Sequence, residues 1–174
     1  MCLRLKNGKK PKAIIAVHLY GMPYNVTKIH ELGQKYEIPI IEDSAEALGS
    51  EVKGKKCGTF GDFSILSFNG NKIITTSGGG ALVTKNQADK EKAIFLATQA
   101  RDNAPHYEHS EIGYNYRMSN ILAGIGRGQL EVLENRVMTR RNNFYFYKKH
   151  IKNLEFTFLE EPEGYYSNRW LTCI

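Results

Sequence analysis

The segment from residue 12 to residue 43 holds two short apolar runs separated by an amphipathic stretch, and this order strongly restricts the fold. The run 12–18 (KAIIAVH) is rich in β-branched residues and predicts a buried strand that ends at His18. Apolar residues at helical spacing over 26–36 predict a helix, and 38–41 (IPII) predicts a second buried strand. Strand, helix and strand in this order form the βαβ unit of a parallel sheet.

The rest of the sequence extends this pattern. Strands are expected at 63–68, at 80–84, at 154–158 and within 165–174. A helix capped by Asn86 is expected to extend to about Arg101, and a long helix that can contain breaks is expected from Ser119 to His150. We therefore predict an α/β fold with a mostly parallel sheet and flanking helices. A long helix and the start of a small α+β C-terminal domain are expected to follow the sheet.

Composition and charge exclude several classes of protein. With 174 residues, 41% of them hydrophobic, the chain is long enough for one domain with a core. No apolar run reaches the roughly 18 residues that a membrane-spanning helix needs, so we predict no membrane insertion. The net charge of +6 favours anionic partners in general. No nucleic-acid-binding motif is found, and we predict no nucleic acid partner.

The cysteines and the N-terminus indicate the cellular compartment. Cys2, Cys57 and Cys173 are odd in number and lack the spacing of metal ligands. Free thiols are typical of reducing compartments. The basic N-terminus lacks the apolar region of a secretion signal. We therefore expect a cytoplasmic protein without a metal site.

Two side chains near predicted strand ends are candidates for a catalytic site. Asp43 and Lys72 each follow a predicted parallel strand, and ligands of such sheets bind at the carboxyl ends of the strands. Each residue alone has an ordinary explanation: Asp43 as a cap of a helix or turn, Lys72 as a solvated loop lysine. Together with Ser67 they provide what a pyridoxal phosphate enzyme needs. These are an amine for the aldehyde, a carboxylate for the pyridine nitrogen and a hydroxyl for the phosphate.

Four motifs occur in an order that resembles one protein family. They are IEDSAEALGS (41–50), LSFNGNKIITTSGGGALVT (66–84), GYNYRMSNILAGIGRGQLEVL (113–133) and SNRWLTCI (167–174). The sequence resembles the DegT-type sugar nucleotide aminotransferases, which are fold-type I pyridoxal phosphate enzymes, over nearly the whole chain. The motif SFNGNKIITTSGGG is most similar to that of the family branch that aminates UDP-4-keto-6-deoxy-N-acetylglucosamine in the bacillosamine-type step.

The resemblance implies roles for individual residues. Lys72 matches the catalytic lysine that binds the cofactor covalently, Asp43 matches the partner of the pyridine nitrogen, and Ser67 matches a phosphate ligand. Asn115 matches a residue that reaches the cofactor phosphate of the neighbouring subunit, which implies a homodimer with shared sites. Glu46 stands where the family often has glutamine in contact with the phenolic oxygen of the cofactor, so it departs in residue type.

His18 matches a residue that lines the active site on the substrate side. The ordinary explanations remain open here. His18 can equally be a hydrogen-bonded core histidine, Glu46 a surface carboxylate and Asn115 a turn residue.

The resemblance further implies a reaction and a domain division. The expected reaction moves an amino group from an amino acid, with glutamate as the expected donor, to a keto sugar attached to a nucleotide, for surface glycan or polysaccharide biosynthesis. Residues 1–150 correspond to a partial large cofactor-binding domain with its connecting helix. Residues 151–174 correspond to the beginning of a truncated small domain.

The family's N-terminal phosphate-binding turn and stacking aromatic ring have no counterpart before Ala13, so we expect a partial sequence. We also expect the chain alone to be weakly stable, prone to associate and poorly active. A second hypothesis is a non-catalytic remnant that serves only as a binding or dimerisation module. A third is anion or nucleic-acid binding through basic loops, with salt-dependent affinity.

Overall fold

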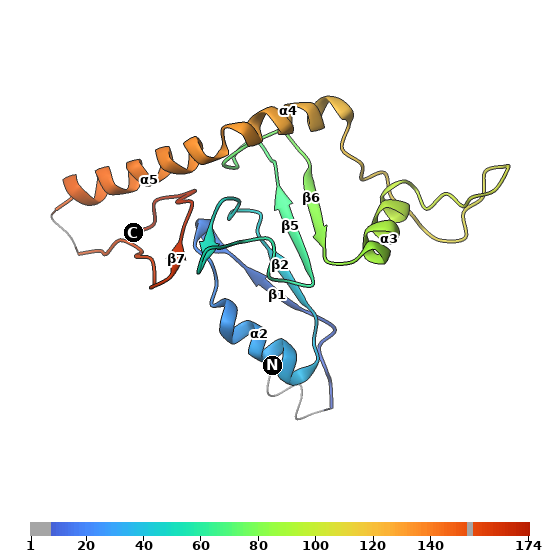
Figure 1. The fold of residues 1–174 in the computed structure, drawn as a ribbon, viewed down its shortest axis with the longest axis horizontal. Coiled ribbons are helices and arrows are strands. Elements are labelled where there is room, and N and C mark those ends of the chain that lie inside the picture. Colours follow the sequence, from blue (N-terminus) through green and yellow to red (C-terminus); the bar gives the residue numbers. More distant parts are fainter. Residues whose placement is uncertain (1–7, 153–154) are drawn as a thin grey trace.

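The computed structural model describes residues 8–152 and 155–174, and its centre is a four-stranded sheet (Figure 1). The strands are β1 (Ile14–Val17), β2 (Ile40–Asp43), β5 (Phe63–Ser67) and β6 (Gly80–Thr84), in the order β1-β2-β5-β6. The first three strands run parallel, and β6 runs antiparallel to β5. The predicted mostly parallel sheet with flanking helices is confirmed.

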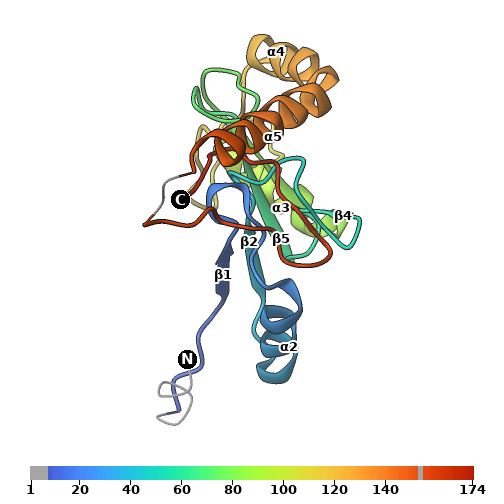
Figure 2. The ribbon, with the colours of Figure 1, turned by 90° about the vertical axis from the view of Figure 1, so that its left-hand side faces the viewer.

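The register of the sheet separates its residues into two faces. Asp43 pairs with Val17 on β1 and with Ile65 on β5, so these three side chains share one face. Their neighbours in the strands, including Glu42 and Ser64, lie on the other face and are buried. Helix α2 (Val26–Tyr36) lies on one side of the sheet (Figure 2). The face that carries Asp43 is open and apolar, with Ile15, Val17, Ile65 and Leu82 all exposed.

Two of the helices begin where their side-chain caps predict. Asn86 accepts a hydrogen bond from Asp89 N–H and caps α3 (Gln87–Ala97), which ends before Arg101 because Gln99 and Ala100 adopt positive φ. Ser119 caps α4 (Asn120–Glu131), and Val132 separates it from α5 (Leu133–His150). Helices α4 and α5 run across the carboxyl end of β5 (Figure 1). None of the helices described here is long and apolar enough to cross a membrane.

The C-terminal segment returns to the first half of the chain. A second sheet joins β3 (Glu51–Val52), β4 (Lys55–Lys56) and β7 (Tyr165–Tyr166), with β7 beside β3. A short 3-10 turn, η1 (Leu19–Gly21), follows β1.

The strand predicted at 154–158 is wrong for residues 155–158, and residue 154 lies outside the described part. Phe158 packs against a helix instead: its ring meets the Phe144 ring edge to face, with centroids 5.7 Å apart. The strand predicted within 165–174 is confined to β7. The domain boundary at residue 150 stays a prediction.

Candidate active site

The carboxyl ends of two neighbouring strands carry the predicted site residues. Asp43 is the last residue of β2, and Ser67 is the last residue of β5. Lys72 follows in a tight turn, in which its own N–H donates to the carbonyl of Asn69 at 3.0 Å. Ligands of parallel sheets bind beyond this edge. The fold therefore places the lysine, the aspartate and the serine on segments that meet at the expected end of the sheet.

The amine of Lys72 is held rather than free. Its Nζ lies 3.6 Å from Oε1 of Glu46 and 4.7 Å from the ring centroid of Trp170, and only 14% of the side chain is exposed. Oε2 of Glu46 accepts a hydrogen bond of 2.6 Å from the N–H of Tyr20. Lys72 is thus not an ordinary solvated loop lysine, and Glu46 is not an isolated surface carboxylate. The glutamate places a negative charge beside the lysine amine.

Asp43 and Ser67 have the atoms for their predicted roles. Oδ1 of Asp43 accepts from the N–H of Ala45 at 3.1 Å, which caps the turn after β2. In the described part of the chain no hydrogen bond reaches Oδ2 of Asp43. Oγ of Ser67 accepts a long hydrogen bond of 3.4 Å from the N–H of Asn69 and keeps its own hydrogen for donation. Both side chains are half-buried.

His18 occupies a different environment, because its side chain has no exposed area. Nδ1 accepts the N–H of Tyr24 at 3.1 Å, so the ring hydrogen lies on Nε2, which donates to Oε1 of Glu42 at 2.8 Å. A fully buried ring cannot contact a substrate in this conformation. The geometry supports the alternative of a hydrogen-bonded core histidine and gives no support to a substrate-side role.

Glu42 is the centre of this buried cluster and was not predicted. Six donors surround its two oxygens: His18 Nε2, the hydroxyls of Ser44 and Ser64, and the N–H groups of Gly58, Phe60 and Gly61. Burial raises the pKa of Glu42, but the hydrogen bonds outweigh burial and lower the pKa from 4.5 to about 2. The only signal in the sequence is an acidic residue inside the buried run IIED.

Cys57 completes a group of three potential metal ligands with His18 and Glu42, whose ligand atoms lie within 4.8 Å of one another. The ring nitrogens of His18 and the carboxylate oxygens of Glu42 are engaged by hydrogen bonds. Burial raises the pKa of the Cys57 thiol to about 12, so the thiol stays protonated. The group is a hydrogen-bonded core and not a set of vacant ligands.

Asn115 lies away from this edge, in an exposed segment next to α3. It forms an isolated antiparallel bridge with Thr98, and the close approach needs Gly113, since an added Cβ would overlap the backbone of Gln99. No contact joins Asn115 to Lys72 in residues 8–152 and 155–174. Its predicted role in a neighbouring subunit's site stays a prediction.

The family of the chain follows from comparison with known proteins. The family model described as DegT/DnrJ/EryC1/StrS aminotransferase family matches residues 6–174. EpsN of Bacillus subtilis (strain 168), whose name describes a pyridoxal phosphate-dependent aminotransferase, is 56% identical over 170 residues, or 97% of this chain and 44% of that protein. A GDP-perosamine synthase of Escherichia coli O157:H7 is 42% identical over 169 residues, or 97% of this chain and 46% of that protein.

A solved structure agrees with this assignment. PseC of Helicobacter pylori, an aminotransferase involved in the biosynthesis of pseudoaminic acid, superposes with a TM-score of 0.87 at 30% identity, over 94% of this chain and 45% of that one. The chain spans less than half the length of each of these three relatives. The resemblance inferred from the motifs is confirmed, and the chain belongs to the DegT/DnrJ/EryC1/StrS aminotransferase family.

Proposed function

We propose that this chain carries the catalytic lysine of a pyridoxal phosphate-dependent sugar aminotransferase. The observation that carries the proposal is the amine of Lys72, held 3.6 Å from Glu46 at the sheet edge where Asp43 and Ser67 end their strands. The side chains at this edge fit the cofactor. They offer one amine, one carboxylate with an oxygen that accepts no hydrogen bond in the described residues, and one hydroxyl that can donate its hydrogen. Membership of an aminotransferase family supports the same reading.

Each residue would contribute one function. When bound, pyridoxal phosphate supplies an aldehyde for covalent attachment and a ring that accepts electrons during amino transfer. Asp43 would hold a proton at the ring nitrogen, and Ser67 would donate a hydrogen bond to the phosphate. Nζ of Lys72 would form the covalent attachment and, once released, would move a proton as general base and acid. Glu46 would hold that amine in place by charge.

The substrate belongs to the proposal as well. Relatives named for GDP-perosamine synthesis and for pseudoaminic acid biosynthesis support a keto sugar linked to a nucleotide as the amino acceptor. We infer an amino acid donor, with glutamate as the first candidate, and a role in surface glycan biosynthesis. A UDP-linked 4-keto-6-deoxy sugar is the specific substrate that the motif SFNGNKIITTSGGG favours.

Assembly and location follow from the same proposal. Asn115 is exposed and free to reach a second copy, as a homodimer with shared sites requires. The free thiols of Cys57 and Cys173 agree with a reducing compartment such as the cytoplasm. A non-catalytic binding module is not favoured, because such a module has no need to hold a lysine amine beside a carboxylate.

Covalent attachment of the cofactor to Lys72 tests the proposal. The purified chain is mixed with pyridoxal phosphate, reduced with borohydride and analysed by peptide mass spectrometry, and a visible absorption spectrum is recorded after dialysis without reduction. We expect a band that survives dialysis and an adduct on Lys72. Both should be lost in Lys72→Ala. Lys90→Ala, a change of an exposed lysine on α3, is the matched control and should keep both signals.

Two results would overturn the proposal for this chain. One is the absence of a dialysis-resistant band from the wild-type chain. The other is an equal band in Lys72→Ala, which would show that attachment occurs at other lysines. Bleaching of the band by glutamate would support the donor assignment.

A further inference from the structure

Trp170 contacts the catalytic lysine from a distant part of the sequence. It is the only tryptophan of the chain and is 7% exposed. The centroid of its indole ring lies 4.7 Å from Nζ of Lys72, a distance at which a cation is attracted to an aromatic face. Its indole N–H donates a hydrogen bond of 2.8 Å to the carbonyl of Asn71. One side chain therefore holds both the amine and the backbone next to it.

Asn168 links Trp170 to the segment that carries Glu46. Its Oδ1 accepts the backbone N–H of Trp170 at 2.9 Å. Its Nδ2 donates to the carbonyls of Glu46 and Leu48, both at 2.9 Å. Since Glu46 also contacts the amine of Lys72, the contacts form a closed ring that runs from Lys72 through Glu46, Asn168 and Trp170 back to Lys72.

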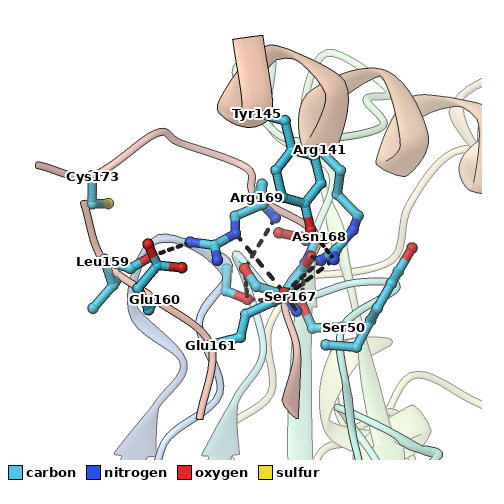
Figure 3. A network of polar contacts seen from close by, with 12 residues as sticks. Ser50, Arg141, Tyr145, Leu159, Glu160, Glu161, Ser167, Asn168, Arg169 and Cys173 are labelled. Carbon is cyan, nitrogen blue, oxygen red and sulfur yellow. Dashed lines mark hydrogen bonds and ion pairs between the residues drawn. The ribbon is translucent and has the colours of Figure 1, made fainter. Parts of the chain in front are cut away.

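The segment that carries Trp170 is itself fixed in place (Figure 3). Arg141 on α5 donates to both carboxylate oxygens of Glu161 and, at 2.6 Å, to the carbonyl of Ser167. The N–H of Ser167 donates to Glu161 at 2.6 Å, and the guanidinium of Arg169 lies 3.7 Å from the ring centroid of Phe144. Because these groups are buried or largely covered, the segment 165–170 has a rigid support on α5.

We propose that Trp170 is a positioning residue that holds the free amine of Lys72 in its reactive place. The proposal rests on the proposed function, because it assigns a role at the same lysine. The stem of a lysine is flexible and its ammonium is a compact charge. An unsupported amine would leave the sheet edge whenever it is not covalently attached. Its contacts with the indole ring and with the carboxylate of Glu46 confine it, so that it remains within reach of the reacting groups.

Ring-current shifts in NMR spectra test this contact without any cofactor. The lysines of the intact chain are reductively methylated with ¹³C-formaldehyde, and the dimethylamine resonance of Lys72 is assigned by its loss in Lys72→Arg. We expect this resonance upfield of the solvated lysines, because it lies over the indole face. In Trp170→Leu the upfield shift should disappear. In Trp170→Phe it should be largely retained, because an aromatic face remains although the hydrogen bond to Asn71 is lost.

The chain supplies internal controls for this experiment. Lys92 lies over Phe95 with its Nζ 5.1 Å from the ring centroid, and its resonance should stay in place when Trp170 is changed. A general loss of structure would move both resonances, whereas loss of the positioning contact moves only that of Lys72.

Two results would overturn the inference: a wild-type Lys72 resonance at the position of the solvated lysines, or one that Trp170→Leu leaves unchanged. The wild-type spectrum alone gives the first result, so the inference remains testable even if a variant does not fold. An upfield shift without cofactor attachment would refute the proposed function of the chain and leave the positioning contact standing. Cofactor attachment at Lys72 without an upfield shift would refute the positioning contact and leave the proposed function standing.

Discussion

Replacement of Glu42 by glutamine should strongly destabilise the fold, although Glu42 lies outside the proposed chemistry. The carboxylate is fully buried and accepts six hydrogen bonds, three at each oxygen. An amide keeps one acceptor oxygen, and its NH₂ group faces the three donors of the other. Each buried donor left without a partner costs about 1–3 kcal/mol, so Glu42→Gln should lower the free energy of unfolding by at least about 3 kcal/mol.

The same carboxylate should make stability depend on pH. Its pKa is lowered from 4.5 to about 2 in the folded chain, so the stabilisation is complete above pH 4.5 and is lost as the pH falls towards 2. A difference of about 2.5 pKa units corresponds to about 3 kcal/mol in total. At about pH 3.5, one unit below the ordinary pKa, about 1.4 kcal/mol should already be lost.

Urea unfolding followed by far-ultraviolet circular dichroism measures both effects at pH values from about 7 to about 3.5. The loss of stability that Glu42 contributes in this range should be absent from Glu42→Gln. Glu91→Gln, on the exposed surface of α3, is the matched control and should change stability by less than about 0.5 kcal/mol. If Glu42→Gln were as stable as this control, or kept the pH dependence of the wild type, the reasoning about the buried carboxylate would be refuted.

Three further predictions concern contacts and surfaces outside the proposed catalytic residues. Arg141→Lys should lower the free energy of unfolding by about 2 kcal/mol in urea titrations, because a lysine cannot replace the paired hydrogen bonds to Glu161. Gly21→Ala should shift the tryptophan emission towards that of exposed indole, because the added Cβ would overlap Oδ1 of Asn168 and φ is +87°. Leu82→Glu should reduce self-association in sedimentation velocity, because Leu82 is 49% exposed on the open apolar face.

The order of elements could be predicted because each carries its own local signal. The apolar runs gave the strands β1 and β2, and Asn86 and Ser119 marked helix starts that the structure confirms. Strand direction has no such signal, so the antiparallel pairing of β6 with β5 was not foreseen. The apolar residues at 155–158 made no strand because a strand needs a neighbour to pair with, and Phe158 found an aromatic ring instead.

The candidate site, like the fold, could be predicted only where local sequence patterns indicate it. Asp43 and Lys72 stand directly after strands, and parallel topology alone brings such positions to one edge. The contacts that hold the lysine were not predictable from local patterns. Trp170 reaches Lys72 across most of the chain, and Asn168 joins the segment of Glu46 through bonds between residues 122 positions apart. Local patterns also do not show that the His18 ring is buried, because this depends on the loop that follows the strand end.

The neighbouring carboxylates of β2 show how one strand can contribute both to stability and to the proposed site. Successive side chains point to opposite faces, so Glu42 enters the buried network while Asp43 lies on the open face at the carboxyl edge. β5 repeats the arrangement, since Ser64 donates to Glu42 and Ser67 lies three positions later on the other face.

A register shift of one residue would exchange these roles. It would bury the aspartate among donors placed for a longer side chain and expose the glutamate. The six hydrogen bonds to Glu42 therefore also fix the register that presents Asp43 to the site. On this reasoning, Glu42→Gln should weaken cofactor attachment at Lys72 even under conditions in which the variant remains folded.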